Sequence, residues 1–466
     1  MAKVKALFRC AACGHQVPKW VGRCPDCGEW GSIEEGLPPV AASGAASVAP
    51  RSPAVRITEI DANAAGAVPT GIGELDRVLG RGVVPGSVIL LAGEPGVGKS
   101  TLLLEAVKHW AHAGRTALYV TGEESAGQVR LRAERTDAVH ENIYLAAETD
   151  LATILGHVEQ VRPTLLIVDS VQTVVATGTD GVSGGVTQIR ASTTALVSLA
   201  KNSGVAVILV GHVTKDGNVA GPRSLEHLVD VVLSFEGDRH SSLRLIRGIK
   251  NRFGASDEVG CFEQRADGIH EVVDPSGIFV HQHDSAVAGS VNLVAMDGRR
   301  AMVGEIQALL HKTQANMPRR AASGLDSARM SMMLAVAAKH SNMPTYDQEV
   351  YVSTVGGMKV TEPAADLAIF LALKSSFTDK PIPHGTVAIG EVGLTGEIRR
   401  VSSTARRVAE AKRLGFTHAV IPAGTDEDMP SGIRVSKVSD LSEAHRAASF
   451  ASVPKSPHQD LGDAPF

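Results

Sequence analysis

The stretch SVILLA-GEPGVGKST-LLLEAVKHW, residues 87–110, decides the fold of this chain. An apolar run with the character of a buried strand leads into G-x-x-x-x-G-K-[ST], and a helical pattern follows directly. The glycines allow backbone N–H groups to converge on phosphate oxygens, and the N-terminus of the helix adds partial positive charge. The segment therefore predicts a phosphate-binding loop and a nucleoside triphosphate site.

The residues of this loop have separate roles in the prediction. Lys99 is long enough to reach the β and γ phosphates, and the Ser100 hydroxyl is the expected protein ligand of Mg²⁺. Chance matches to the loop pattern occur, but they seldom have both the preceding strand and the following helix. We expect the nucleotide, ATP, to contact Gly93, Glu94, Pro95, Gly96, Val97, Gly98, Lys99, Ser100 and Thr101.

Acidic residues after two other apolar runs complete the predicted site. The run ending at Asp169 has the Walker B arrangement, which organises Mg²⁺ and its waters, and its position about one strand–helix unit beyond the loop supports it. Glu123 follows the run TALYVTG, which we expect to lie beside the loop strand, and it is the predicted catalytic base. Glu124 is the alternative base. Both glutamates could instead be an N-cap and first-turn pair of the next helix.

Composition divides the 466 residues into five segments. Short β-branched runs alternate with helix-length segments from about residue 57 to 280, which predicts an α/β domain with a mostly parallel sheet covered on both faces. The segments are a cysteine module at 1–36, a flexible Pro/Ala/Ser-rich linker at 37–56, the α/β domain at 57–280, a second segment of strands and helices at 285–450, and a polar tail at 451–466 that we expect to be disordered.

Four of the five cysteines lie in the first segment, as Cys10-Ala-Ala-Cys13 and Cys24-Pro-Asp-Cys27. Two such turns can present four thiolates to a tetrahedral Zn²⁺. A module of about 30 residues has too small a core to fold alone, so the metal would supply much of its folding energy. Free or disulfide-linked thiols are the alternative, and His15 is surplus to a four-sulfur site.

The bulk properties are those of an ordinary globular protein, with 44% hydrophobic residues and a formal net charge of −4. The net charge gives no overall sign of nucleic-acid binding, although one face can still carry a basic groove. No apolar run approaches the ~18–20 residues of a membrane span, and the N-terminus lacks a signal-peptide pattern. We therefore expect a cytoplasmic protein without a membrane partner.

From Val68 to about residue 275 the chain resembles the RecA-type ATPases, and more narrowly the bacterial RadA family of DNA repair proteins. The pentapeptide KNRFG is a hallmark of that family, and the cysteine module placed before the core matches it as well. The segments that carry the resemblance are PTGIGELDRVLGRGVVPGS, GEPGVGKST, VTGEESAGQV, LLIVDS, GHVTKDG and Lys250-Asn-Arg-Phe-Gly254.

The resemblance implies a homo-hexameric, DNA-stimulated ATPase that moves along single-stranded DNA and extends branched recombination intermediates by branch migration. A RecA-class recombinase is an implied partner. In that family the KNRFG segment couples ATP to DNA across the subunit boundary. Lys250 and Arg252 would then be catalytic cations toward a neighbour's γ-phosphate, or phosphate contacts to DNA. Without the family context, they would merely cap a strand end on the surface.

The same resemblance implies roles for two loops and one histidine. His212 matches the position where RecA-like motors keep a polar sensor of the γ-phosphate, although a histidine after a strand is most often a capping residue. The loops after Asp169 and after His212 lie where such motors place DNA-facing loops. Lys215 and Arg223 in the second loop are the predicted DNA contacts. Neither loop carries an aromatic side chain for base stacking.

Residues 285–450 resemble the peptidase domain of Lon, which implies an α+β fold. In Lon a serine nucleophile follows a proline, and a lysine from a later helix activates it. The segment TEPAAD places Ala364 at the serine position, and GEVGLTGEIRRVSSTARR places Ala405 at the lysine position. Acyl transfer by this route then has neither nucleophile nor base, so we expect no peptidase activity. The remaining roles are a scaffold for the ring and a basic face for DNA.

Three functions from different classes remain open. A DNA-dependent ATPase motor in recombinational repair is the leading hypothesis. An ATP-dependent protease or unfoldase is the second, and the two alanines argue against it. An ATP-binding regulatory protein that does not hydrolyse is the third, and Glu123 and Asp169 argue against that one.

Overall fold

The computed structural model describes residues 7–13, 15–17, 19–36, 55–59, 66–212, 225–237, 242–280 and 285–449. Contacts divide the chain into two compact units, residues 1–62 and residues 63–466. Most of the expected linker and all of the expected tail lie outside the described residues.

The first unit is a small antiparallel sheet in the order β2-β1-β3. Its strands are β1 (Leu7–Cys10), β2 (Gln16–Val17) and β3 (Ile33–Gly36), and η1 (Ile57–Glu59) follows later in the same unit. The buried apolar group consists of only Cys10, Val17, Cys24 and Ile33 among the described residues. So small a core leaves the cysteines to hold the module together.

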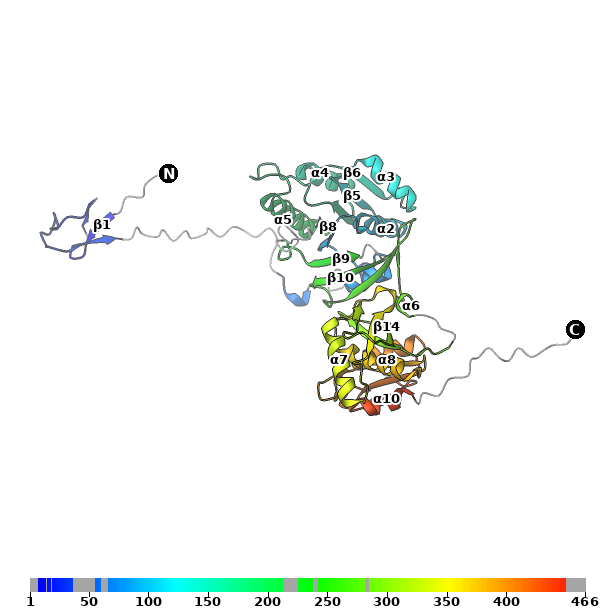
Figure 1. The fold of residues 1–466 in the computed structure, drawn as a ribbon. Helices are drawn as coiled ribbons and strands as arrows, with labels where there is room; N and C mark the ends of the chain where they lie inside the picture. Colours follow the sequence, from blue (N-terminus) through cyan, green and yellow to red (C-terminus); the bar gives the residue numbers. More distant parts are fainter. Residues whose placement is uncertain are drawn as a thin grey trace. The chain divides into compact units, whose positions relative to one another are not determined.

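In the second unit, nine strands among the described residues form one large sheet (Figure 1). The neighbours from β9 to β6 pair in parallel, and β9 to β12 pair antiparallel. In spatial order the strands are β12 (Ile269–Glu271), β11 (Val259–Gln264), β10 (Leu243–Asn251), β9 (Val231–Gly237), β4 (Val88–Gly93), β8 (Ala206–His212), β7 (Leu165–Asp169), β5 (Ala117–Thr121) and β6 (Ile143–Ala147).

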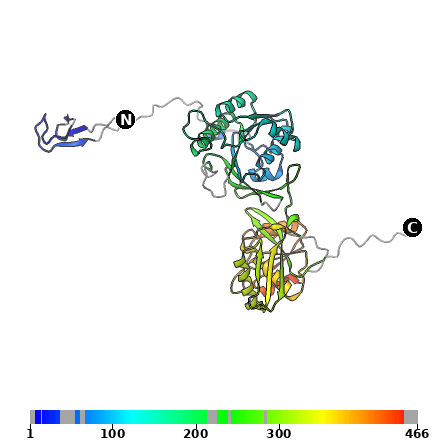
Figure 2. The same cartoon turned by 45° about the horizontal axis from the view of Figure 1, so that its top comes forward.

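Helices cover both faces of this sheet (Figure 2). One core joins the sheet to α1 (Gly73–Leu79), α2 (Lys99–His112) and α3 (Ala126–Arg135). The opposite core joins it to α4 (Leu151–Val161) and α5 (Val186–Ser203). A strand buried on both faces has an unbroken apolar sequence, as residues 88–92 do. The predicted mostly parallel α/β fold is confirmed.

The order of the strands differs from the expected one. The loop strand β4 lies between β8 and β9, so the expectation that residues 116–122 would lie beside it is wrong. Two strands, β5 and β6, also separate the loop from the Walker B strand in sequence, rather than about one strand–helix unit. The side of the sheet on which each crossover returns sets the order of parallel strands, and that is a tertiary choice.

The C-terminal part of the second unit is a mixed sheet with β14 as its longest strand. In spatial order the strands are β15 (Arg320–Ser323), β16 (Gln348–Thr354), β14 (Arg300–Lys312), β13 (Ser290–Asp297), β17 (Thr386–Ala388), β20 (His418–Pro422) and β21 (Arg434–Val438). A separate pair is formed by β18 (Glu391–Val392) and β19 (Ile398–Arg399).

One face of this sheet packs on three helices, and the other face packs on one. The larger core holds α7 (Ser327–His340), α8 (Asp366–Thr378) and α10 (Leu441–Ser449). The smaller core holds α9 (Thr404–Arg413). The short elements are α6 (Ser276–Phe279), η4 (Val355–Gly357) and η5 (Pro363–Ala365). The chain enters α8 through η5, which carries the expected serine position Ala364.

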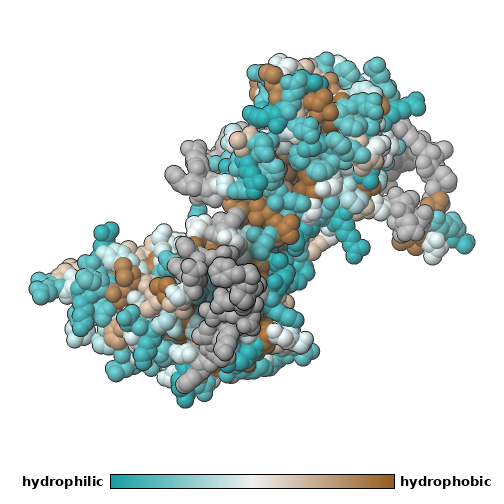
Figure 3. Space-filling view, turned by 90° about the vertical axis from the view of Figure 1, so that its right-hand side faces the viewer, coloured by the Kyte–Doolittle hydropathy of each residue, from teal (hydrophilic) through white to brown (hydrophobic). Residues whose placement is uncertain are grey.

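Membrane-crossing helices are absent from the part of the chain that the structure describes. None of the described helices combines the length and the apolar character that crossing a bilayer requires. The face shown in Figure 3 is mostly hydrophilic, with hydrophobic residues in small groups.

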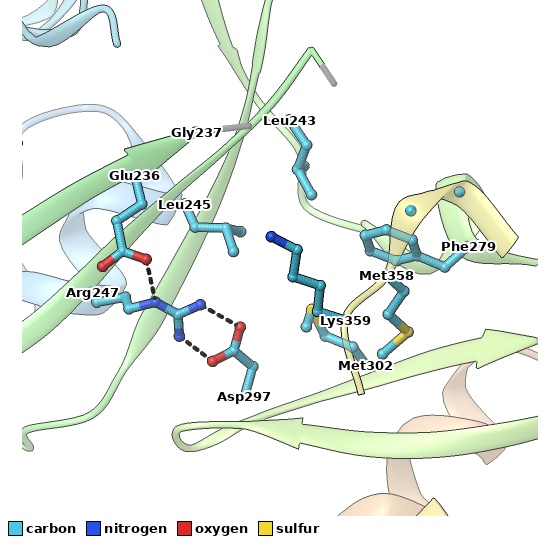
Figure 4. Close-up of a pocket in the computed structure, with 12 residues that line it drawn as sticks. Glu236, Gly237, Leu243, Leu245, Arg247, Phe279, Asp297, Met302, Met358 and Lys359 are labelled. Carbon is cyan, nitrogen blue, oxygen red and sulfur yellow. Dashed lines mark hydrogen bonds and ion pairs between the residues drawn. The ribbon is translucent and has the colours of Figure 1, made fainter. Parts of the chain in front are cut away.

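The turn between β13 and β14 joins the C-terminal sheet to the large sheet. Arg300 is buried in an ion pair with Glu74 of α1 and donates to the carbonyl oxygen of Val259 at 3.1 Å. Arg247 of β10 lies between Glu236 and Asp297, at the edge of a cavity of about 290 Å³ (Figure 4). Arg300 and Arg247 thus link the C-terminal sheet to the large sheet and its helix α1.

Candidate active site

The phosphate-binding loop connects β4 to the first turn of α2. Gly98 has a φ of 108°, and a Cβ there would lie 2.7 Å from Oε1 of Gln264 and 2.8 Å from Cδ1 of Ile269. A side chain at Gly93 would collide with the carbonyl oxygen of Phe235. These glycines are therefore required by a positive φ and by the close approach of neighbouring strands.

Lys99 turns its ammonium back over this loop. Its Nζ donates to the carbonyl oxygens of Gly93 and Glu94, both at 2.9 Å, and lies 3.2 Å from Nδ1 of His212. Burial lowers the pKa of Lys99, and the carboxylates of Asp169 and Glu123 partly oppose that shift. The cation is thus held at the mouth of the loop by carbonyl groups that phosphate oxygens can replace.

The polar residues of the site come from three parallel strands that end at the same edge. Glu123 follows β5, Asp169 ends β7 and His212 ends β8. Oε1 of Glu123 accepts from Oγ of Ser170 at 2.5 Å and lies 3.0 Å from Nε2 of His212. Because Nδ1 of His212 faces the Lys99 ammonium, the hydrogen-bond network assigns the ring proton to Nε2. The histidine links the loop lysine to the predicted base.

The two adjacent glutamates have different surroundings. Glu124 forms an ion pair with Arg132 of α3, and its backbone N–H donates to Oγ1 of Thr121 at 3.1 Å. Ser125, rather than either glutamate, caps α3. Glu123 lies with the residues of the site and Glu124 lies with α3, so the geometry favours Glu123 as the base over its alternative.

A cavity of about 460 Å³ adjoins the loop between residues 93–97 and 234–237. Arg244 of β10 lines this cavity, and its Nε donates to the carbonyl oxygen of Val97 at 3.2 Å. The sequence analysis missed Arg244, and no local pattern marks it. An antiparallel strand that is far along the chain brings it to the loop.

The KNRFG segment lies at the opposite edge of the sheet. Asn251 pairs with Val231 at the start of β9, whereas the loop residue Gly93 pairs with Phe235 toward the other end of the same strand. Nζ of Lys250 donates to the carbonyl oxygens of residues 226 and 229, at 2.6 and 2.8 Å. Arg252 lies 3.2 Å from a carboxylate oxygen of Asp230.

This arrangement separates the predicted site residues into groups. The structure brings Lys99, Ser100, Glu123, Asp169 and His212 to one edge, and it does not bring Lys250 or Arg252 to that edge. The predicted DNA contacts Lys215 and Arg223 lie outside the described residues.

The four predicted zinc ligands form one cluster in the first unit. Their Sγ atoms all lie within 4.8 Å of one another, with 3.7 Å between Cys10 and Cys27 and 3.6 Å between Cys13 and Cys24. A tetrahedron with Zn–S bonds of about 2.3 Å has sulfur–sulfur edges of about 3.8 Å, so the cluster fits zinc. None of these cysteines is in a disulfide.

A buried ion pair links the two segments that match the Lon catalytic motifs. Ala364 is buried, and Glu362, two residues earlier, accepts two hydrogen bonds from Arg407 at 2.6 and 2.7 Å. Arg407 is 1% exposed and also donates to the carbonyl oxygen of Val294 at 2.7 Å. The two matched motifs are therefore joined by a buried arginine.

Comparisons with known proteins agree with this arrangement of parts. The AAA domain model matches residues 56–218, the rubredoxin metal binding domain model matches 8–35, and the Lon protease (S16) C-terminal proteolytic domain model matches 316–443. The DNA repair protein RadA of Mycolicibacterium smegmatis is 56% identical over 93% of this chain and 95% of its own length. The proteins of that name from Mycobacterium tuberculosis H37Rv and Bacillus subtilis are 53% and 42% identical, over 100% and 96% of this chain and 99% of each relative.

Proposed function

Because this chain belongs to the RadA family of DNA repair proteins and contains the ATPase domain and zinc module of that family, we propose that it is a DNA-stimulated ring motor. The motor translocates on single-stranded DNA and promotes branch migration of recombination intermediates. The observation that carries the proposal is the placement of Lys99 and Glu123 at one edge of the sheet and of the KNRFG cations at the other.

Hydrolysis at the first edge needs an oriented water and a stabilised γ-phosphate. Glu123 is placed to accept a proton from the attacking water, and Ser170 and His212 hold its carboxylate in position. The Lys99 ammonium exchanges its carbonyl partners for phosphate oxygens when ATP binds. Ser100 and Asp169 would hold Mg²⁺, which would neutralise negative charge on the phosphates.

The KNRFG segment then acts on a second subunit. Lys250 and Arg252 lie at the opposite edge of the sheet from the phosphate-binding loop of their own chain. They can therefore reach a γ-phosphate only in a neighbouring chain. In a homo-hexamer each chain would complete the site of the next, and hydrolysis would depend on assembly. Contact with DNA phosphates is the second role for the same cations.

The C-terminal sheet serves as a scaffold and has no peptidase activity in this proposal. Ala364 and Ala405 supply neither a nucleophile nor a base, and the ion pair of Arg407 with Glu362 joins the two motifs. A RecA-class recombinase remains the partner that the family suggests. The protease alternative keeps only the fold of this region in its favour.

The test is unwinding of forked and three-stranded DNA with ATP, together with ATP turnover with and without single-stranded DNA. Wild type should show stimulated turnover and unwinding, and Lys99→Ala should show neither. Arg252→Ala should lose turnover, and an inactive Lys99→Ala subunit with an intact Arg252 should partly restore it in mixed rings. Absence of DNA stimulation in the wild-type protein, or ATP-dependent casein cleavage, would reject the motor.

A further inference from the structure

A hydroxyl group is buried in the core of the large sheet. Tyr119 lies in the middle of β5 and is 1% exposed. Its ring belongs to the core that the sheet forms with α1, α2 and α3. Phenylalanine would fill such a position without burying a polar atom, and a buried hydroxyl lowers stability unless it finds a partner.

The partner is the Walker B carboxylate. The phenol of Tyr119 donates to Oδ2 of Asp169 at 2.6 Å. Within the part of the chain that the structure describes, no other side chain donates to this carboxylate. The tyrosine therefore contacts one of the two residues that are expected to hold the metal.

We propose that Tyr119 is a positioning residue of the Mg²⁺ site, where its hydroxyl fixes the orientation of the Asp169 carboxylate. The phenol donates to Oδ2 of the carboxylate, so Oδ1 is the oxygen that would remain available to Mg²⁺ or its waters. This inference rests on the proposed ATP hydrolysis only in that ATP with Mg²⁺ is the ligand of the site.

The protonation state of the phenol agrees with this role. Burial raises the pKa of Tyr119 well above its usual range, and the neighbouring charge of Asp169 acts in the same direction. A phenol with a raised pKa is a hydrogen-bond donor near neutral pH, in agreement with its contact to Oδ2 of Asp169.

The test uses the full-length protein and the variant Tyr119→Phe, which keeps the ring and removes the hydroxyl. Binding of a fluorescent, non-hydrolysable ATP analogue is titrated with Mg²⁺ and with a chelator. In the chelator, the affinity of Tyr119→Phe for the analogue should equal that of wild type. The factor by which Mg²⁺ raises this affinity should be about tenfold smaller in the variant, because hydrogen bonds to charged groups contribute about this much free energy. The Mg²⁺ concentration for half-maximal ATP turnover should rise about tenfold as well.

The matched control is Tyr144→Phe on the neighbouring strand β6, where the side chain is 47% exposed. It should keep the wild-type response to Mg²⁺. An unchanged Mg²⁺ response in Tyr119→Phe overturns the proposal. So does an equal loss of binding with and without Mg²⁺ together with a lower Tm, which would assign Tyr119 to packing alone. If the wild type binds the analogue but hydrolyses no ATP, the proposed function fails and the binding arm still decides the role of Tyr119.

Discussion

The phosphate-binding loop and the Lon-like site both carry recognisable catalytic motifs, but their cationic side chains differ in the partners that they bind. At the loop, Lys99 is held by two backbone carbonyls beside a cavity of about 460 Å³. At the Lon-like site, Arg407 is enclosed and bonded to Glu362 and to the Val294 carbonyl. One region keeps its polar groups available to a ligand, and the other satisfies them within the protein.

The difference teaches how a catalytic region is distinguished from a structural one in the same chain. A cation that must bind substrate keeps partners that a ligand can replace, whereas a buried ion pair without replaceable partners contributes to a defined fold. Motif matching alone treats both regions as former or present enzymes. The partners of each charged group separate them.

The largest expected effect is at the loop. Glu123→Gln removes the predicted base and keeps a similar shape, so ATP turnover should fall by about 10²–10⁴-fold while nucleotide affinity is retained. Turnover and analogue binding are measured on the same preparation. Glu124→Gln is the matched control and should stay within about tenfold of wild type, since Arg132 holds that side chain away from the site. Equal losses in the two variants would contradict the assignment.

The next effect is at the Lon-like site and concerns stability. Arg407→Ala removes both guanidinium donors from the Glu362 carboxylate, which keeps only the backbone N–H of Met296. It also removes a donor from the Val294 carbonyl, so the free energy of unfolding should fall by about 3–5 kcal/mol. Urea unfolding monitored by circular dichroism measures this change. Arg406→Ala, on the exposed side of the same helix, is the control and should cost about 1 kcal/mol or less. A neutral Arg407→Ala variant would refute the structural role.

A smaller effect in the same region depends on pH. Burial and then the Arg434 charge lower the pKa of His418 to about 4. Between that value and its ordinary pKa near 6.5, the unfolded chain binds more protons than the folded one, so stability should fall as the pH drops through this window. Allowing for solvent screening, the loss is roughly 1–2 kcal/mol.

Urea unfolding at pH 7.5 and 4.5 measures that loss. His418→Gln should reduce the difference between the two pH values, and His311→Gln, at an exposed position, should preserve it. If the free energy of unfolding changes equally between the two pH values in wild type and in His418→Gln, His418 is not the cause of the pH dependence.

The smallest effect tests whether burial, rather than charge, gives Arg407 its importance. Arg400 forms an ion pair with Asp426, and both side chains are mostly exposed. Arg400→Ala should therefore change the free energy of unfolding by less than about 1 kcal/mol. A loss as large as that of Arg407→Ala would show that the two arginines stabilise the fold in the same way.

The sequence by itself determined the parts of this protein that depend on neighbouring residues. A phosphate-binding loop is made of consecutive backbone N–H groups and a helix N-terminus, so residues 93–101 were sufficient to predict it. The spacing of the four cysteines predicted the metal module for the same reason. The missing serine and lysine of the Lon-like segment were also visible as Ala364 and Ala405.

Only the tertiary structure decided which distant residues meet. It placed β8 and β9, not β5, beside the loop strand, and it brought Arg244 to Val97. It also brought the Tyr119 hydroxyl to the Asp169 carboxylate, and the Arg407 guanidinium to the Glu362 carboxylate. The physical reason is twofold: crossover connections set the order of the strands, and buried polar groups find partners across the sheet. Such contacts join residues that are far apart in the chain, so they leave no periodic or local sequence pattern.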